Sequence, residues 1–141
     1  MKVKDIMTKQ VIGVRDFETV AVAARTLEQY NIGALPVFGP GGSVCGVITD
    51  RDMVTRCLAA NREPNKTTVG QIMTNRLTTV TPDTDVATAA YIMGKHQIRR
   101  LPVLDEGRLC GMVSLKDLAV RQEIAIDAVD ALADICENTA Q

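Results

Sequence analysis

The sequence predicts a mixed α/β (α+β) fold made of two tandem β-α-β-β-α repeats. Three short segments occur twice in the same order, 66 positions apart for the first two and 65 for the third. One residue is therefore missing from the turn around Gly41-Gly42, where Gly107 stands in the second repeat, and a loop absorbs such a deletion more easily than a strand or helix. The paired segments are Ile6-Met7-Thr8 with Ile72-Met73-Thr74, Ile32-x-x-Leu35-Pro36-Val37 with Ile98-x-x-Leu101-Pro102-Val103, and Cys45-Gly46-Val47-Ile48-Thr49-x-x-Asp52 with Cys110-Gly111-Met112-Val113-Ser114-x-x-Asp117.

Each repeat is expected to begin with an extended stretch followed by a helix. The extended stretches are residues 11–14 and 77–80, whose β-branched content favours a strand. In the second repeat Pro82-Asp83-Thr84 is a typical helix start, and the apolar residues that follow it recur at helical spacing.

A hairpin and a second helix complete each repeat. Strands are predicted at 34–38 and 44–48 around a Gly-Pro-Gly-Gly turn, and at 101–104 and 109–113 around Asp105-Glu106-Gly107. The second helices are expected to begin at Asp50 and Leu115. Because proline has no N–H to donate, Pro36 and Pro102 predict that their strands lie at a sheet edge or hold proline at their first residue.

The chain is divided here into repeat 1 at residues 1–64, repeat 2 at 65–121 and a C-terminal amphipathic helix at 122–141. The polar segment 61–68 is interpreted as the link. About 60 residues is near the lower limit for independent folding, so the repeats are expected to pack on each other. The apolar stripe of the terminal helix is expected at Ala125, Val129, Leu132 and Cys136.

Composition excludes several classes of function. The net charge is −1 and opposite charges are interspersed, which argues against nucleic-acid binding. Apolar runs are too short to span a bilayer, and residues 1–15 have no secretory pattern. A cytoplasmic protein that binds neither nucleic acid nor membrane is therefore expected.

Metal binding and catalysis are not expected either. The four cysteines include no Cys-x-x-Cys pair, and His96 is the single histidine. Without a nucleophile–base pair, the sequence predicts no enzyme, no catalytic residue and no catalytic cofactor. Cys45 and Cys110 occupy equivalent positions, and each is interpreted as a small buried hydrophobe in a strand, with a regulatory thiol pair as the alternative.

The third repeated segment has the residues that carry chemistry. In each occurrence a strand ends at a hydroxyl residue, Thr49 or Ser114, and Asp52 or Asp117 follows three positions later. This is the pattern of a capping box, in which the hydroxyl and the acid satisfy backbone N–H groups. The same geometry suits a nucleotide, because a helix N-terminus attracts phosphate and a carboxylate accepts hydrogen bonds from both hydroxyls of a ribose.

These ordered, doubled motifs resemble the tandem cystathionine-β-synthase (CBS) domain pair, or Bateman module, over residues 1 to about 120. The resemblance implies repeats packed about a pseudo-twofold axis, with adenosine-containing ligands (AMP, ADP, ATP or S-adenosylmethionine) in the clefts between them. It implicates Thr49, Asp52, Ser114 and Asp117 in contacts with phosphate and ribose. It also implies a homodimer.

The repeats differ where a phosphate would need positive charge. Arg99 and Arg100 precede Leu101 in repeat 2, whereas Gly33 and Ala34 precede Leu35 in repeat 1. In nucleotide-binding members of the family that this sequence resembles, basic residues at this position contact phosphate. The planar arginine side chain can bond two phosphate oxygens at once. Repeat 2 is thus the better candidate, and the alternative is that two arginines merely flank a strand.

The leading hypothesis is a small regulatory module that binds an adenosine-containing ligand and signals through conformation, association or an unidentified protein partner. The alternative is a dimeric scaffold with vestigial pockets that is regulated, if at all, through its thiols. The first requires a ligand with different affinities for two states of the protein.

Overall fold

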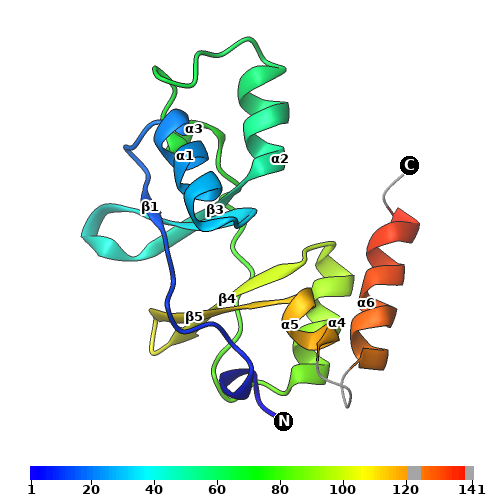
Figure 1. The fold of residues 1–141 in the computed structure, drawn as a ribbon. Helices are drawn as coiled ribbons and strands as arrows, with labels where there is room; N and C mark the ends of the chain where they lie inside the picture. Colours follow the sequence, from blue (N-terminus) through cyan, green and yellow to red (C-terminus); the bar gives the residue numbers. More distant parts are fainter. Residues whose placement is uncertain (121–124, 139–141) are drawn as a thin grey trace. The chain divides into compact units, whose positions relative to one another are not determined.

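The computed structural model describes residues 1–120 and 125–138 and divides the chain into two compact units (Figure 1). We call residues 12–77 the central unit, and residues 1–11 together with 78–141 the terminal unit, after their places in the sequence. The two units therefore do not follow the repeat boundaries, because the first eleven residues belong with the second half of the chain.

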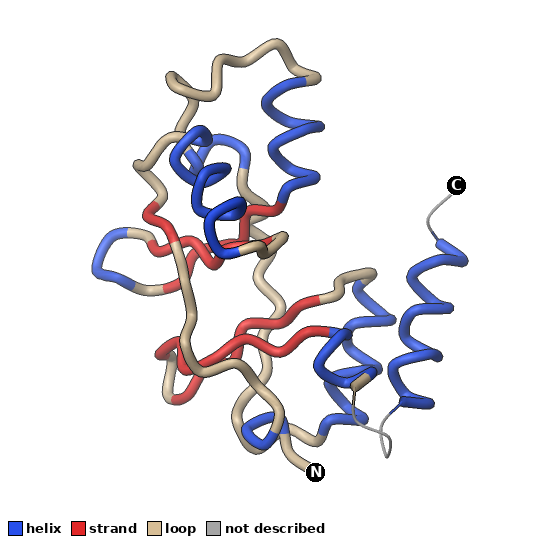
Figure 2. Tube along the Cα trace, viewed as in Figure 1, coloured by secondary structure: helices blue, strands red, loops and turns tan. Residues whose placement is uncertain are grey.

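A three-stranded sheet with helices on one side forms the central unit (Figure 2). The strand order is β1-β2-β3, with β1 parallel and β3 antiparallel to β2. Its elements, in chain order, are β1 (Val14–Arg15), α1 (Val20–Tyr30), β2 (Ala34–Phe38), η2 (Pro40–Gly42), β3 (Val44–Thr49), α2 (Asp50–Asp52), the π-helical turn η3 (Met53–Leu58) and α3 (Val69–Ile72).

The expectation that proline would confine its strand to an edge is wrong for the central unit. Pro36 is the third residue of β2, which is the middle strand of the sheet. The two-residue strand β1 pairs with β2 only at Val37 and Phe38, so β1 makes no ladder pair with Pro36. A middle strand tolerates proline here because its neighbour is so short.

Helix α1 is closed at its N-terminus by the segment interpreted as a link. Thr19 caps the helix through its hydroxyl, which accepts from the Val22 amide at 3.3 Å. The Val20 amide donates to the Thr67 carbonyl at 2.9 Å, and the Ala21 amide to the Pro64 carbonyl at 3.1 Å. These bonds satisfy N–H groups that a helix start leaves without partners.

The described part of the terminal unit contains an antiparallel β-hairpin, a short 3-10 helix and three α-helices. In chain order its elements are η1 (Val3–Asp5), α4 (Val86–His96), β4 (Arg100–Asp105), β5 (Arg108–Ser114), α5 (Leu115–Ala119) and α6 (Ala125–Asn138). The extended stretch predicted at 77–80 does not form a strand, since only Val80 bridges to Val103. Its counterpart in the central unit is likewise shorter than predicted and begins at Val14.

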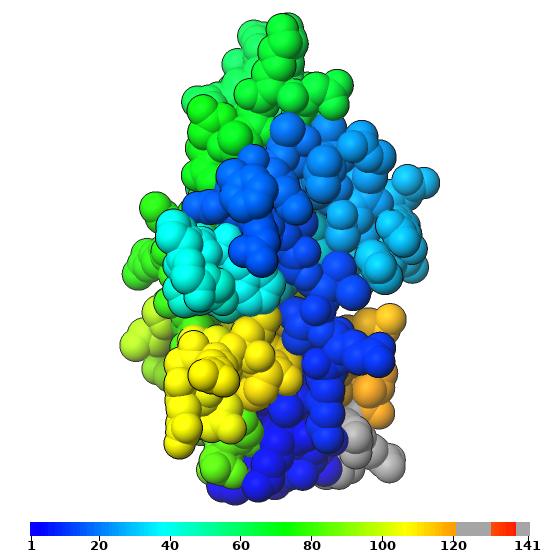
Figure 3. Space-filling view, turned by 90° about the vertical axis from the view of Figure 1, so that its left-hand side faces the viewer, coloured from blue at the N-terminus to red at the C-terminus, as the bar shows by residue number. Residues whose placement is uncertain are grey.

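The first eight residues complete the terminal unit, and Figure 3 shows this dark-blue segment beside the yellow hairpin. The Val3 amide donates to the Thr84 carbonyl at 2.8 Å, and the Val86 amide donates to the Met1 carbonyl at 3.1 Å. The Lys2 ammonium lies 2.8 Å from the Asp85 carboxylate at the start of α4. Their hydrogen bond lowers the pKa of Asp85 and raises the pKa of Lys2.

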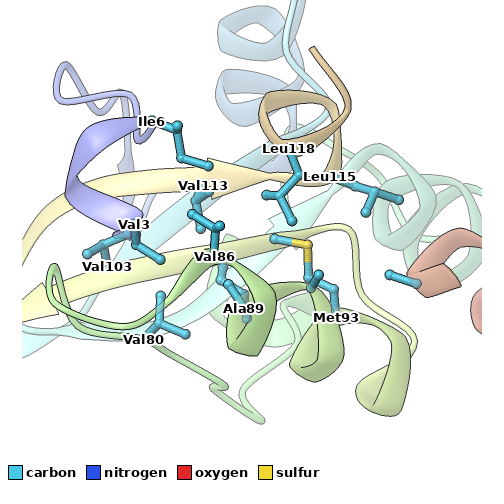
Figure 4. Packing of buried hydrophobic residues seen from close by; sticks show 13 residues of the cluster. Val3, Ile6, Val80, Val86, Ala89, Met93, Val103, Val113, Leu115 and Leu118 are labelled. Atoms are coloured by element: carbon cyan, nitrogen blue, oxygen red, sulfur yellow. The ribbon is translucent and has the colours of Figure 1, made fainter. Parts of the chain in front are cut away.

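Val3 and Ile6 bring the N-terminal segment into the hydrophobic core of this unit (Figure 4). Val3 is fully buried, and Ile6 retains 9% of its exposure. The rest of this core comes from the hairpin and the helices: Val80, Val86, Ala89, Ala90, Met93, Leu101, Val103, Val113, Leu115, Leu118 and Ala131.

Helix α6 lies within the predicted terminal helix but turns a different face to the core. Leu132 and Cys136 of the predicted apolar stripe are exposed, whereas Ala131 is buried. A Cβ added at Gly94 of α4 would lie 3.3 Å from the Ala131 Cα, so the two helices meet closely there. The side chains of 125 and 129, also in the predicted stripe, lie outside the described residues.

The two units are thus built alike, each from an opening segment of one repeat and the body of the other. Residues 67–74 make hydrogen bonds with α1 and β3, and residues 1–8 make the equivalent bonds with α4 and β5. Thr74 exchanges backbone hydrogen bonds with Val47 at 2.9 Å, and Thr8 does so with Met112 at 2.8 and 3.0 Å. Neither repeat, counted along the sequence, closes its own core.

Candidate functional site

Both predicted hydroxyl–carboxylate pairs form capping boxes at a strand-to-helix junction. The Ser114 hydroxyl accepts from the Asp117 amide at 3.1 Å, and the Asp117 carboxylate accepts from the Ser114 amide at 2.8 Å. Thr49 and Asp52 do the same at 3.0 Å in both directions. The capping interpretation is therefore correct for both pairs, and it leaves the second lone pairs of each group for other partners.

The terminal unit brings four predicted site residues together. Arg100 lies directly opposite Ser114 in the β4–β5 register. The Arg99 carbonyl accepts from the Leu115 amide at 2.8 Å, which fixes Arg99 beside the first turn of α5. Both arginine side chains are exposed, and Asp117 is half-buried one turn into α5. Two cations, a hydroxyl and a carboxylate therefore lie at one end of the hairpin.

The central unit has the same backbone arrangement without the cations. Ala34 lies opposite Thr49, and the Asp50 amide donates to the Gly33 carbonyl at 3.1 Å. Residues 33 and 34 have no charged group to offer a phosphate. The two units therefore share the backbone arrangement and differ, as predicted, in the side chains at residues 33–34 and 99–100.

Two residues that contact Asp52 in the central unit were missed by sequence reasoning. The Thr74 hydroxyl donates to both carboxylate oxygens of Asp52, at 3.3 and 3.4 Å. The Arg56 Nε lies 3.8 Å from Asp52 Oδ1. Asp52 is buried, with 7% of its surface exposed. The sequence contained a signal for each residue. Thr74 is the last residue of a repeated segment. Arg56 follows Asp52 by four residues, a spacing that brings two side chains together on one face of a helix.

A pocket of about 340 Å³ in the central unit lies away from these residues. It opens near the turn end of the sheet, and none of the predicted site residues lines it. Its lining residues are Gly13, Val14, Arg15, Glu18, Phe38 and Gly42.

The two cysteines at equivalent positions, Cys45 and Cys110, are packed against hydrophobic residues rather than exposed to solvent. Cys45 and Cys110 are half-buried against the cores of their own units. The Cys110 thiol lies 3.4 Å from the Val103 carbonyl, to which it can donate. Burial raises the pKa of both thiols, and Asp16 and Asp105 add to the rise at Cys45 and Cys110 respectively.

Alkylation at neutral pH is expected to modify Cys136 before Cys45 and Cys110. Cys136 is exposed, whereas a raised pKa leaves the other two with less of the reactive thiolate at any given pH. Their rates should increase as the pH rises past 9. Iodoacetamide labelling followed by peptide mass spectrometry at pH 7 and pH 9 measures this. Equal rates for all three at pH 7 would favour the thiol-regulated alternative.

Two features are absent from the described part of the chain. No group of three His, Cys, Asp or Glu side chains in it lies close enough to hold a metal ion. None of its helices combines the length and the apolar character needed to cross a membrane.

Comparison with known sequences establishes the class of protein. The sequence profile of the CBS domain matches this chain twice, at residues 3–59 and 69–122. These matches cover well over half of the chain, so the protein belongs to the CBS domain family. The resemblance inferred from the motifs and the predicted α+β fold of tandem repeats are both confirmed.

Individual relatives match nearly end to end. The CBS domain-containing protein YhcV of Bacillus subtilis (strain 168) is 41% identical over 133 residues, which is 94% of each chain. The crystal structure of Hypoxic Response Protein I with two coordinated zinc ions matches with a TM-score of 0.79 at 36% identity, over 86% of this chain and 98% of that one.

A third match has two adenosine compounds bound. The CBS domain pair of protein MJ0100, in complex with 5′-methylthioadenosine and S-adenosyl-L-methionine, has a TM-score of 0.77 at 33% identity. The match covers 85% of this chain and 94% of that one.

Proposed function

We propose that this protein is a regulatory module that binds an adenosine-containing ligand at the end of the β4–β5 hairpin. Arg99, Arg100, Ser114 and Asp117 form the proposed site. The observation that carries the proposal is the position of Arg100 directly opposite Ser114, with Asp117 one turn further on. The two adenosine compounds bound by the related MJ0100 domain pair support the same class of ligand for this chain.

Each group has a chemical role in the proposed site. The guanidinium groups of Arg99 and Arg100 bind phosphate oxygens through charge-assisted hydrogen bonds. The Ser114 hydroxyl accepts from a backbone amide and still has its own hydrogen to donate to the ligand. Asp117 accepts from the ribose hydroxyls through the carboxylate oxygen that its capping bond leaves open.

Output from this site passes through shape or association. The chain binds its ligand without chemical conversion, so no catalytic residue or cofactor is proposed. A ligand can regulate only by binding one conformation or assembly more tightly than another. The predicted homodimer and an unidentified protein partner are the two routes by which that difference would be transmitted.

A thermal-shift panel with AMP, ADP, ATP, S-adenosylmethionine, NAD and GTP tests the proposal. A ligand at a hundredfold excess over its Kd adds about 2.7 kcal/mol, which raises the melting temperature by several degrees. We expect a shift with one or more adenosine compounds, lost in Asp117→Ala. No shift with any of the six compounds, once retained ligand has been removed, would favour the scaffold.

The arginine variants identify which part of the ligand is bound. Arg100→Ala is expected to weaken ATP and AMP at least tenfold and adenosine much less, because each charge-assisted hydrogen bond contributes about 1.5–3 kcal/mol. Arg108→Ala is the matched control, since Arg108 is also exposed but lies at the opposite end of the hairpin, across from Asp105. Isothermal titration calorimetry measures each Kd. Equal losses for adenosine and the nucleotides would contradict the phosphate assignment.

A further inference from the structure

We infer that other side chains of the same chain bind the Asp52 carboxylate internally. Each chain therefore binds one ligand, at Ser114 and Asp117. Thr74 and Arg56 provide the internal bonds. The number of ligands rests on the proposed function, whereas the internal binding of Asp52 is independent of any ligand.

The hydrogen-bonding capacity of Asp52 is largely used. Its Oδ2 accepts from the Thr49 amide at 3.0 Å and lies 3.4 Å from the Thr74 hydroxyl. Its Oδ1 lies 3.3 Å from the same hydroxyl and 3.8 Å from the Arg56 Nε. With only 7% of the residue exposed, a ribose would have to displace Thr74 to reach it.

Asp117 has the same place in the other repeat and fewer partners. Its Oδ2 accepts from the Ser114 amide at 2.8 Å. Within the described residues its Oδ1 has no hydrogen bond or ion pair, and the side chain is half-buried rather than buried. Arg121, the counterpart of Arg56, lies outside the described residues, so the comparison between the two sites depends on the threonines.

Thr74 and Thr8 show that the difference comes from the side chain. Both residues exchange two backbone hydrogen bonds with the neighbouring strand, Thr74 with Val47 and Thr8 with Met112. Yet Thr74 is half-buried with its hydroxyl on Asp52, whereas Thr8 is exposed and makes no such bond to Asp117. With the same backbone arrangement, the threonine covers the aspartate carboxylate in the central unit and leaves it uncovered in the terminal unit.

Arg56 strengthens the closure, because its guanidinium bonds to groups inside the central unit. Its Nη1 donates to the Ile72 and Met73 carbonyls, at 3.3 and 3.2 Å. This guanidinium is therefore directed at the end of α3 and at Asp52. Gly33 and Ala34, beside Thr49, supply no replacement cation for a phosphate.

Melting temperatures of four variants test the internal bond without any ligand. Thr74→Val and Asp52→Ala should each lower the melting temperature by several degrees, because a half-buried hydrogen-bonded pair is broken. Thr8→Val and Asp117→Ala, their counterparts, should lower it clearly less. Should Asp52→Ala fail to fold, the near-isosteric pair Thr74→Val and Thr8→Val decides the matter. Equal losses within each matched pair would overturn the inference.

Calorimetric titration with AMP and with ATP tests the ligand count. We expect one site per wild-type chain, a Kd within about threefold of wild type in Thr74→Val and Asp52→Ala, and at least a tenfold loss in Asp117→Ala. Two sites per chain, or an equal loss in Asp52→Ala, would overturn the inference while leaving the proposed function intact. Should the wild type bind no adenosine compound of the thermal-shift panel, the proposed function fails and the melting comparison alone decides whether Asp52 is held internally.

Discussion

Residues 12–77 expressed alone are expected to fold, whereas residues 1–64 are not. The first fragment contains the whole core of the central unit, including Val69 and Ile72 from the segment that follows the link. The second lacks that segment and keeps residues 1–11, whose partners lie in the absent half of the chain. It would also leave the first amide of α1 without the Thr67 carbonyl.

Circular dichroism and urea unfolding of the two fragments measure this difference. A chain of about 66 residues is near the lower size limit for an independent domain, so we expect a cooperative but modest transition for 12–77. Residues 1–64 should show no cooperative transition. A cooperative transition in 1–64 with none in 12–77 would mean that the sequence repeat, not the compact unit, is the folding unit.

Gly46→Ala is expected to destabilise the protein by about 1–3 kcal/mol, the usual cost of overpacking. A Cβ at this position would lie 2.6 Å from the Thr74 carbonyl oxygen and 2.9 Å from the Met73 sulfur. The backbone atom cannot turn aside as a side chain can. Glycine is needed here because the opening segment of repeat 2 pairs with β3 next to it, where Thr74 and Val47 exchange backbone hydrogen bonds.

The matched substitution in the other unit separates backbone from side-chain crowding. A Cβ at Gly111 would meet the Met7 sulfur at 2.7 Å and the Thr8 carbonyl oxygen at 3.0 Å. Met7→Ala and Gly111→Ala combined should therefore cost less than the sum of the two single losses, whereas the losses from Met73→Ala and Gly46→Ala should add. Urea unfolding of the single and double variants gives the coupling energies. A coupling energy at Gly46 as large as that at Gly111 would show that sulfur, not backbone, sets the limit.

Local patterns predicted the elements well because their causes are local. The helix that follows Pro82-Asp83-Thr84 runs from Val86 to His96, and the two glycine-containing turns both join antiparallel strands. The capping boxes were also foreseen, since a hydroxyl and an acid three residues apart are enough to form them.

The sequence could not show which opening segment packs against which hairpin. A repeat shows that Thr8 and Thr74 are alike, but either could lie against either hairpin. Bonds from Thr74 to Asp52 depend on that choice and on burial, and so were missed. The stripe of α6 failed for a related reason, because the small residues Gly94 and Ala131 set the contact rather than the larger Leu132.

The exchange of opening segments also bears on how such a chain could have arisen. A protein holding one repeat could make the same contacts only by trading its first eight residues with a second molecule, which is domain swapping. Joining two repeats in one chain turns that trade into an internal event, with an effective concentration in the millimolar range. Duplication would thus have relieved the fold of any dependence on how much protein the cell contains.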